Sequence, residues 1–218
     1  MIVHHLSNSH SHVILCLLEE LGVDYSIVPH QRNPETNLSP TSLQAIHPVA
    51  KAPTIEDQGV VMIESTGIIL YVLEKYGGGR LRPSPGTADA MRFYQWLTFI
   101  EGSAKAPLMG YFQRLGLPAD DPTRLGAERH LRRFIQPLEA ALGEGGGTLV
   151  PSMFTAADIQ LTFFEELMEG LLPMDQWPNM RAHLQQMRQR DAYRRAEAKG
   201  GPVGIKELFA RAARRRAG

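Results

Sequence analysis

One stretch near the start of the chain has residue types and spacing that suit a small charged ligand. It covers residues 47–65, HPVAKAPTIEDQGVVMIES. Its Lys51 is suited to a carboxylate and its Glu64 to an ammonium group, so the stretch fits a ligand that carries both charges at separate ends.

The stretch 47–65 is predicted to form a recognition edge. Pro53 belongs at the start of a strand, because it has no N–H for the ladder, and the backbone of Ala52 before it stays available to a ligand. Glu64 and Ser65 stand where a strand becomes a helix. The N–H groups and partial positive charge of a helix N-terminus favour a carboxylate there. Lys51 supplies a second anchor for a more distant carboxylate.

Hydrophobic periodicity predicts how these residues are positioned. The first 76 residues indicate a strand, a helix and a strand, then a hairpin and a helix, so that the first two strands form a parallel pair. The expected elements are strands 2–6 and 25–28, a helix 13–21, a short helical piece 41–46, strands around Thr54 and Val61 that meet at Gln58-Gly59, and a helix 65–76.

A change of pattern after residue 76 predicts a second domain. Residues 77–85 are rich in glycine and proline, as linkers are. After them only helical periodicity occurs, over 87–115, 121–142, 155–172 and 178–190. The expected fold class is α/β plus all-α, with a βαβ–ββα domain over 1–77, a linker over 78–86 and a helical bundle over 87–218. Thr155 and Asp158 open one helix in a pattern close to a capping box.

Composition indicates a globular protein of a reducing compartment. Lysine plus arginine equals aspartate plus glutamate at 23 each, which argues against a dedicated nucleic-acid or membrane-surface binder. The single cysteine excludes an internal disulfide, and neither a leader pattern nor a long apolar run is present, so we expect a cytoplasmic location. From Arg181 on there are 11 basic and 3 acidic residues. We expect these to form a solvated helix face and a loose tail.

This arrangement of domains resembles the glutathione transferase superfamily. The run 47–53 followed by Glu64-Ser65 is similar to the glutathione-binding segment of that family, with Pro53 matching its cis proline. Residues 4–28 resemble the first strand and helix of bacterial serine-type members, theta- or beta-like and related to fungal membrane-associated-type transferases. Residues 96–103 resemble their first long helix. The resemblance implies a thioredoxin-like N-terminal domain and glutathione as co-substrate.

The resemblance also implies a role for each site residue. Glu64 and Ser65 would hold the γ-glutamyl group of glutathione, the Ala52 backbone beside Pro53 the cysteinyl part, and Lys51 the glycyl carboxylate. Glu101 would reach across the two-fold interface of a homodimer toward the partner's γ-glutamyl ammonium, with a solvated acid as the alternative.

The implied chemistry is activation of the glutathione thiol. Its pKa is about 8.5, and lowering it by about two units requires about 2.7 kcal/mol. A hydroxyl donor contributes about 1.5–3 kcal/mol and a helix N-terminus about 0.3–1 kcal/mol. Ser9 matches the catalytic serine, and Asn8 is a second candidate donor at the same turn. Cap preference alone would make either of them a helix cap, and we expect Ser11 to be the cap.

Some positions depart from the family pattern. Serine-type members usually carry arginine after the serine and a basic residue at the helix start, where this chain has His10 and Val13. Because histidine titrates near neutrality, we expect a protonated His10 to support activity at lower pH. Ala50 stands where glycine is usual, and Cys16 replaces a frequent tryptophan.

We expect no metal site. His4, His5, His10 and His12 are close in sequence, but strand alternation puts the first two on opposite faces and no carboxylate or cysteine completes a ligand set. Cys16 lies in an apolar helical run, which indicates a core residue rather than a nucleophile.

The sequence is therefore interpreted as a cytoplasmic glutathione transferase. It is expected to conjugate the glutathione thiolate to small electrophiles, and peroxide reduction is a related activity. The expected partners are glutathione, the electrophile and a second copy of the chain, with no nucleic acid and no membrane. A glutathione-binding regulatory protein without catalysis, or a scaffold of the same fold, is the alternative.

Overall fold

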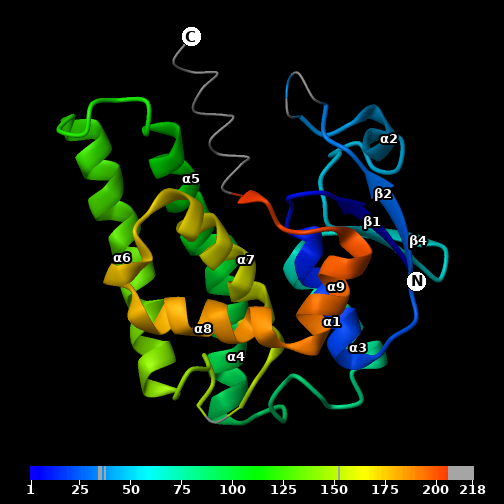
Figure 1. Ribbon diagram of the computed structural model, residues 1–218. Coiled ribbons are helices and arrows are strands. Elements are labelled where there is room, and N and C mark those ends of the chain that lie inside the picture. Colours follow the sequence, from blue (N-terminus) through cyan, green and yellow to red (C-terminus); the bar gives the residue numbers. More distant parts are fainter. Residues whose placement is uncertain (34–35, 37, 152, 206–218) are drawn as a thin grey trace. The chain divides into compact units, whose positions relative to one another are not determined.

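The chain folds into two compact units in a computed structural model that describes residues 1–33, 36, 38–151 and 153–205 (Figure 1). Unit 1 contains Met1–Leu81 and Arg188–Val203. Unit 2 contains Arg82–Met187 and the described residues from Gly204 on. The border at residues 81–82 lies inside the predicted linker 78–86, whereas residues 188–203, which the prediction assigned to the helical domain, group with unit 1. None of the helices in the described ranges has the length and apolar character needed to cross a membrane.

Unit 1 is built on a four-stranded sheet of order β2-β1-β3-β4. The strands are β1 (Ile2–Leu6), β2 (Ser26–His30), β3 (Thr54–Asp57) and β4 (Val60–Ile63). β1 and β2 are parallel, whereas β3 is antiparallel to both β1 and β4. The predicted parallel pair and hairpin are therefore confirmed.

The second strand runs further than the sequence indicates. It was predicted over 25–28, but β2 continues through Pro29 to His30. β2 is an edge strand, and a proline is tolerated there because its missing N–H faces away from the ladder.

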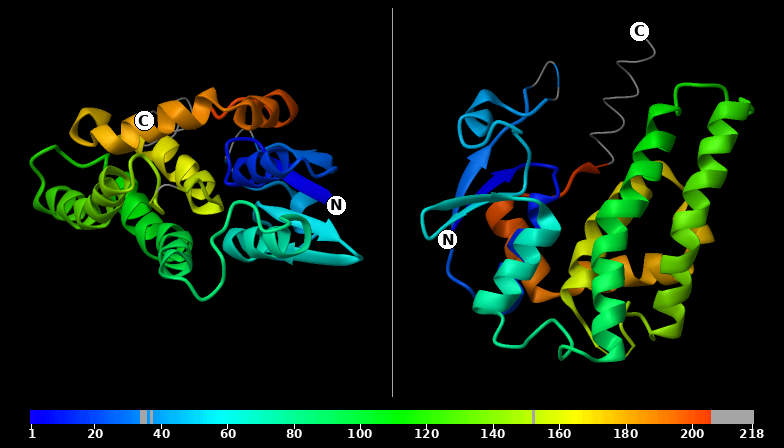
Figure 2. Two further views of the ribbon diagram at one scale, coloured as in Figure 1. Left: turned by 90° about the horizontal axis from the view of Figure 1, so that it is seen from below. Right: turned by 180° about the vertical axis from the view of Figure 1, so that it is seen from behind.

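Three helices accompany the sheet: α1 (Ser11–Leu21), α2 (Thr41–Gln44) and α3 (Ser65–Tyr76). α1 contacts β1 and α3, and Figure 2 shows both helices against the sheet. Their inner faces are fully buried, with Ile14, Leu18, Ile68 and Val72 at no measurable exposure. The apolar stripes read from the sequence thus form the core of unit 1.

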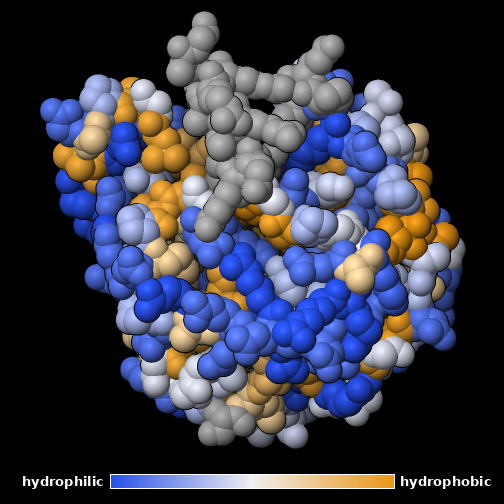
Figure 3. Space-filling model, in the orientation of Figure 1, coloured by the Kyte–Doolittle hydropathy of each residue, from blue (hydrophilic) through white to orange (hydrophobic). Residues whose placement is uncertain are grey.

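The last described helix, α9 (Asp191–Gly200), corrects the predicted loose tail. It packs on α1 with Ala192, Tyr193 and Ala196 buried (Figure 2). Its outer face is largely hydrophilic (Figure 3). The rest of the expected tail, from residue 206 on, lies outside the described residues.

Ion pairs reinforce the contact between α9 and α1. Glu19 of α1 accepts hydrogen bonds from Arg195 Nε at 2.8 Å and from Lys199 Nζ at 2.5 Å. Arg190 pairs with Glu20. Some of the excess basic side chains of the C-terminal region therefore form ion pairs with acidic side chains of α1.

Unit 2 is helical, as predicted. Its helices are α4 (Ala88–Phe99), α5 (Lys105–Gln113), α6 (Pro122–Glu144), α7 (Ala156–Leu171) and α8 (Pro178–Gln189), the last of which ends at the border with unit 1. A π-helical segment η1 (Ile100–Ala104) joins α4 to α5, and a short 3-10 turn η2 (Met174–Gln176) precedes α8. The single helix predicted over 87–115 is thus continuous but changes its winding in the middle.

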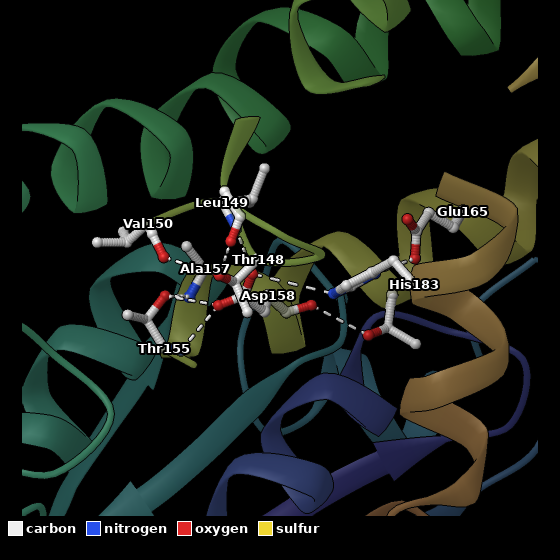
Figure 4. Close-up of polar contacts among 10 residues, drawn as sticks. Thr148, Leu149, Val150, Thr155, Ala157, Asp158, Glu165 and His183 are labelled. Atoms are coloured by element: carbon white, nitrogen blue, oxygen red, sulfur yellow. Dashed lines mark hydrogen bonds and ion pairs between the residues drawn. The ribbon is translucent and has the colours of Figure 1, made fainter. Parts of the chain in front are cut away.

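The start of α7 is held by a buried polar network (Figure 4). The Thr155 side chain accepts from the N–H of Ala157, and Asp158 Oδ2 accepts from the N–H of Thr155 at 2.7 Å, which completes the predicted capping box. Asp158 Oδ1 also accepts from the N–H of Leu149 at 2.8 Å. Asp158 is fully buried, so the aspartate ties the loop before α7 to the helix.

Candidate functional site

Strand pairing brings the two predicted binding regions to one end of the sheet. His4 of β1 pairs with Thr54 of β3, and Thr54 pairs with Ile63 of β4. β1 and β4 therefore end, and β3 begins, at the same edge of unit 1. The turn after β1, the residues before β3 and the residues after β4 consequently lie next to one another, which is the arrangement that an extended ligand requires.

The segment before β3 has the expected backbone form. The Ala52-Pro53 peptide bond is cis, and Pro53 is buried. The Thr54 hydroxyl donates to the carbonyl of Lys51 at 2.7 Å and so fixes the chain before the strand. Lys51 itself is exposed, so its ammonium group is accessible to a solute.

The segment after β4 forms the first turn of α3. Glu64 is the N-terminal flanking residue, and its carbonyl accepts from the N–H of Ile68 at 2.9 Å. Its side chain makes no capping bond and is exposed, while Ser65 is buried. The N–H groups of a first helical turn have no carbonyl partner inside the helix, so this end of α3 is suited to an anion.

Backbone strain concentrates at this end of the sheet. Five non-glycine residues in the described part of the chain have positive φ, and three of them lie in the segments after β1, before β3 and after β4: Asn8 at 55°, Ala50 at 50° and Glu64 at 77°. Such a conformation costs on the order of 1–3 kcal/mol for a residue with a side chain, and least for asparagine. Ala50 therefore occupies a conformation that favours glycine.

Ser9 lies in the turn between β1 and α1, with 6% of its surface exposed. Its hydroxyl donates to the carbonyl of Leu6 at 2.6 Å, and its oxygen lies 2.8 Å from Ser11 Oγ. The N–H of Ser11 donates to Ser9 Oγ at 3.3 Å. The Ser9 hydroxyl thus points inward, toward the end of β1 and the start of α1.

Ser11 does not cap α1, contrary to the prediction. The residue that flanks the helix is His10, which makes no side-chain cap bond, and Ser11 is the first helical residue. The Ser11 hydroxyl lies 2.9 Å from His5 Nδ1, and its oxygen accepts from the N–H of Leu6 at 3.2 Å. It turns away from the helix backbone because β1 offers it better-placed partners.

The two neighbours of Ser9 are placed differently. Asn8 is half-buried, and its carbonyl accepts from Arg32 Nη2 at 3.3 Å, which anchors the turn from the loop after β2. His10 is buried with 4% exposure. Its predicted support of activity at low pH stays a prediction.

His5 is the part of this site that the sequence did not reveal. Its Nε2 lies 2.9 Å from the carbonyl oxygen of Gly200 in α9, and its Nδ1 lies 2.9 Å from Ser11 Oγ. Burial lowers the pKa of His5, while the hydrogen bond to Gly200 acts in the opposite direction and a charged His30 would add to the lowering. Only strand alternation hinted at this face of β1, since His4 points the other way, to Glu56 and His30.

The remaining candidates lie elsewhere. Glu101 belongs to η1 in unit 2 and pairs with Lys105, the first residue of α5, with Nζ 2.9 Å from Oε2. Cys16 is buried, as a core residue would be. No group of histidine, cysteine and acidic side chains suited to a metal occurs among the residues that the structure covers.

A hollow of about 400 Å³ lies between α5 and α6 within unit 2. Its lining includes Pro107, Gly110, Arg114 and His130. The guanidinium group of Arg114 lines this hollow, and its Nη1 donates to the backbone carbonyl of Gly110 at 2.8 Å.

Comparisons with known proteins give a consistent result. Residues 4–80 match the family described as Glutathione S-transferase, N-terminal domain. Glutathione S-transferase 1 of Saccharomyces cerevisiae is 27% identical over 182 residues, which cover 74% of this chain and 77% of the yeast protein.

Solved structures agree over almost the whole chain. A glutathione S-transferase from Actinobacillus pleuropneumoniae is 28% identical with a TM-score of 0.86, covering 95% of this chain and 98% of its own. A sphingomonad glutathione S-transferase complexed with glutathione shares the fold, with 22% identity, a TM-score of 0.72 and coverage of 92% and 99%.

Proposed function

The chain belongs to the glutathione transferase superfamily, and on that premise we propose that it conjugates the glutathione thiolate to small electrophilic molecules. Reduction of peroxides by the same thiolate is a related activity of the proposed site. We further propose that it acts as a cytoplasmic homodimer in detoxification, with Glu101 at the two-fold interface.

The proposed binding mode uses the three segments at the end of the sheet. The Glu64 carboxylate pairs with the γ-glutamyl ammonium of glutathione, and the first turn of α3 at Ser65 receives the adjacent carboxylate. The Ala52 backbone before Pro53 pairs with the cysteinyl part as a strand would. Lys51 holds the glycyl carboxylate.

In this binding mode the thiol lies at the turn after β1. The Ser9 hydroxyl donates to the thiolate, with Asn8 as a second donor. A hydrogen bond to a charged acceptor contributes about 1.5–3 kcal/mol, which is of the size needed to lower the thiol pKa by about two units. The sulfur then attacks the electrophilic carbon and the leaving group departs with the electron pair of the broken bond.

The observation that carries the proposal is the pairing of His4 with Thr54 and of Thr54 with Ile63. This register alone brings the turn of Ser9, the cis Ala52-Pro53 bond and the strained Glu64 to one edge. The same edge in a glutathione-binding regulatory protein would retain the anchors but would have no use for the Ser9 hydroxyl, and a scaffold of the same fold would not bind glutathione.

Calorimetric titration with glutathione tests the proposal when it is combined with initial rates on an activated aryl halide. The variants are Ser9→Ala, Glu64→Gln and, as a matched control, Glu74→Gln on the exposed face of α3. We expect Glu64→Gln to weaken binding about tenfold, the size of one lost charged contact. We expect Ser9→Ala to bind glutathione and to lose most of the rate.

Two results would contradict the proposal. Absence of glutathione binding to the wild type at millimolar ligand would remove the binding function altogether. Binding with no conjugation, or with a rate unchanged in Ser9→Ala, would favour the regulatory alternative.

A further inference from the structure

We propose that His5 and Ser11 are positioning residues that direct the proton of the glutathione thiol away from the sulfur along a chain of hydrogen bonds that ends at α9. The inference rests on the proposed function, because it takes glutathione to bind with its thiol at Ser9. The chain runs from Ser9 Oγ to Ser11 Oγ at 2.8 Å, to His5 Nδ1 at 2.9 Å, and from His5 Nε2 to the Gly200 carbonyl at 2.9 Å.

The hydrogen bond between His5 and Gly200 determines which group donates in each of the other bonds. A carbonyl oxygen only accepts, so His5 Nε2 carries a hydrogen and donates to Gly200. In the neutral ring Nδ1 is then an acceptor, and the Ser11 hydroxyl donates to it. Ser11 Oγ is left to accept, which it does from the N–H of Leu6 and can do from the Ser9 hydroxyl.

Ionisation of the thiol reverses this chain one proton at a time. The S–H bond breaks and its proton bonds to Ser9 Oγ, the proton of Ser9 moves to Ser11 Oγ, and the proton of Ser11 moves to His5 Nδ1. No electrons leave the group. The products are a thiolate that accepts from Ser9 and an imidazolium that donates to Ser11 and to Gly200. The bonds between Ser9, Ser11 and His5 are retained with their direction reversed, and the bond to Gly200 is unchanged.

The reversal also settles where the Ser9 hydroxyl points. Before ionisation its hydrogen has two inward acceptors, the Leu6 carbonyl at 2.6 Å and Ser11 Oγ. Afterwards Ser11 donates to Ser9, and the Ser9 hydrogen is directed outward at the sulfur. A donor that itself accepts from a donor is strengthened, so the thiolate receives a stronger bond than an isolated serine would give.

The surroundings keep His5 neutral until a thiolate forms. Burial lowers the pKa of His5, and a charged His30 of β2 would lower it further. Burial, and after it a charged His5, lower the pKa of His12 of α1 to about 3. The hydrogen bond to Gly200 favours the charged ring, and a thiolate at the far end of the chain adds an opposite charge that favours it as well.

The contact between α9 and His5 requires a glycine at position 200. A Cβ on Gly200 would lie 2.5 Å from Leu15 Cδ1 and 3.0 Å from His5 Nε2, so a side chain there would displace either α9 or the imidazole. The close approach of the α9 backbone is what places a carbonyl on His5.

Nitrogen NMR of the wild-type full chain, labelled with ¹⁵N-histidine, tests the proposal without a mutation at the site. We expect His5 Nδ1 to be unprotonated in the free protein and protonated when glutathione saturates it at neutral pH. S-methylglutathione, which has no thiol proton, should bind and leave Nδ1 unprotonated. The His5 signal is assigned by its absence from His5→Asn.

An unprotonated Nδ1 in the glutathione complex would overturn the inference and leave the proposed function standing. Failure of both glutathione and S-methylglutathione to bind would overturn the proposed function together with it.

Rates of the His5→Asn variant as a function of pH give an independent test. Asparagine can accept from Ser11 but cannot take up the proton, so we expect kcat/KM below the thiol midpoint to fall about tenfold, a shift of about one pH unit. KM for glutathione should change little. His4→Asn, a buried histidine on the other face of β1, is the matched control and should keep the wild-type profile.

A His5→Asn profile identical to that of the wild type, in a protein with native circular dichroism, would refute the proposal. If His5→Asn does not fold, the NMR of the wild type decides, with the His5 signal assigned from Gly200 contacts.

Discussion

Replacing Glu19 by glutamine should loosen α9 from α1. The Glu19 carboxylate is 7% exposed and accepts from the Tyr25 hydroxyl at 2.7 Å, from Arg195 and from Lys199. Burial acts to raise the pKa of Glu19, but these three bonds together outweigh it and hold the pKa below its usual range. Glu19→Gln keeps the size and shape of the side chain but removes the negative charge that accepts from Tyr25, Arg195 and Lys199.

The size of the effect follows from the exposure of the partners. Arg195 and Lys199 are 52% and 51% exposed, so water screens their attraction to Glu19 and rehydrates them when the charge is lost. Tyr25 is half-buried, so water screens its bond to Glu19 less. We expect Glu19→Gln to lower the free energy of unfolding by about 1–2 kcal/mol.

Urea unfolding at low ionic strength measures the loss, and amide hydrogen exchange locates it. Protection of the amides of α9 should fall more than that of α3, and salt near about 0.5 M should reduce the difference from the wild type. Glu74→Gln on the exposed face of α3 is the control for removing a negative charge. Unchanged exchange in α9 would refute the view that Glu19 fastens this helix.

Three further predictions concern stability. Asp57 accepts hydrogen bonds from Lys75, Tyr71 and Tyr76, which lower its pKa, so its contribution to stability is present above about pH 4 and is lost as the pH falls through the folded-state pKa. Asp57→Asn should lower the free energy of unfolding by about 2 kcal/mol at pH 7 and weaken its dependence on pH in the acid range. Burial lowers the pKa of His12 to about 3, so the unfolded state binds more protons below about pH 6.5, and as the pH falls His12 should lower the free energy of unfolding by up to about 1.4 kcal/mol per pH unit. Urea titrations of His12→Leu should lose this contribution, while His5 and His30, whose pKa values burial also lowers, keep theirs. Thr155→Ala should cost about 1–2 kcal/mol in unfolding of unit 2, and an unchanged midpoint would contradict the role of the capping box.

The sequence predicted the first unit because its signals are local. Alternating and helical apolar patterns, the Gln58-Gly59 turn between β3 and β4, and a proline just before β3 each act within a few residues. The capping box of Thr155 and Asp158 is local in the same sense. The anchors Lys51, Glu64 and Ser65 were found because they adjoin these elements directly in the chain.

What the sequence missed depends on contacts between distant residues. α9 has a narrow buried face of Ala192, Tyr193 and Ala196, and its charged partners on α1 are 170 positions or more away in the chain. No periodicity could reveal them. Ser11 was expected to cap α1 because serine favours that position, but the neighbouring strand offered His5 and the N–H of Leu6 instead.

The central claim is that the Ser9 hydroxyl stabilises the glutathione thiolate, and ultraviolet titration of the bound thiol tests it most directly. The thiolate absorbance of glutathione saturating the wild type should appear about two pH units below that of free glutathione, and Ser9→Ala should return the midpoint at least halfway. An equal midpoint for wild type and Ser9→Ala, with glutathione bound to both, would contradict the claim.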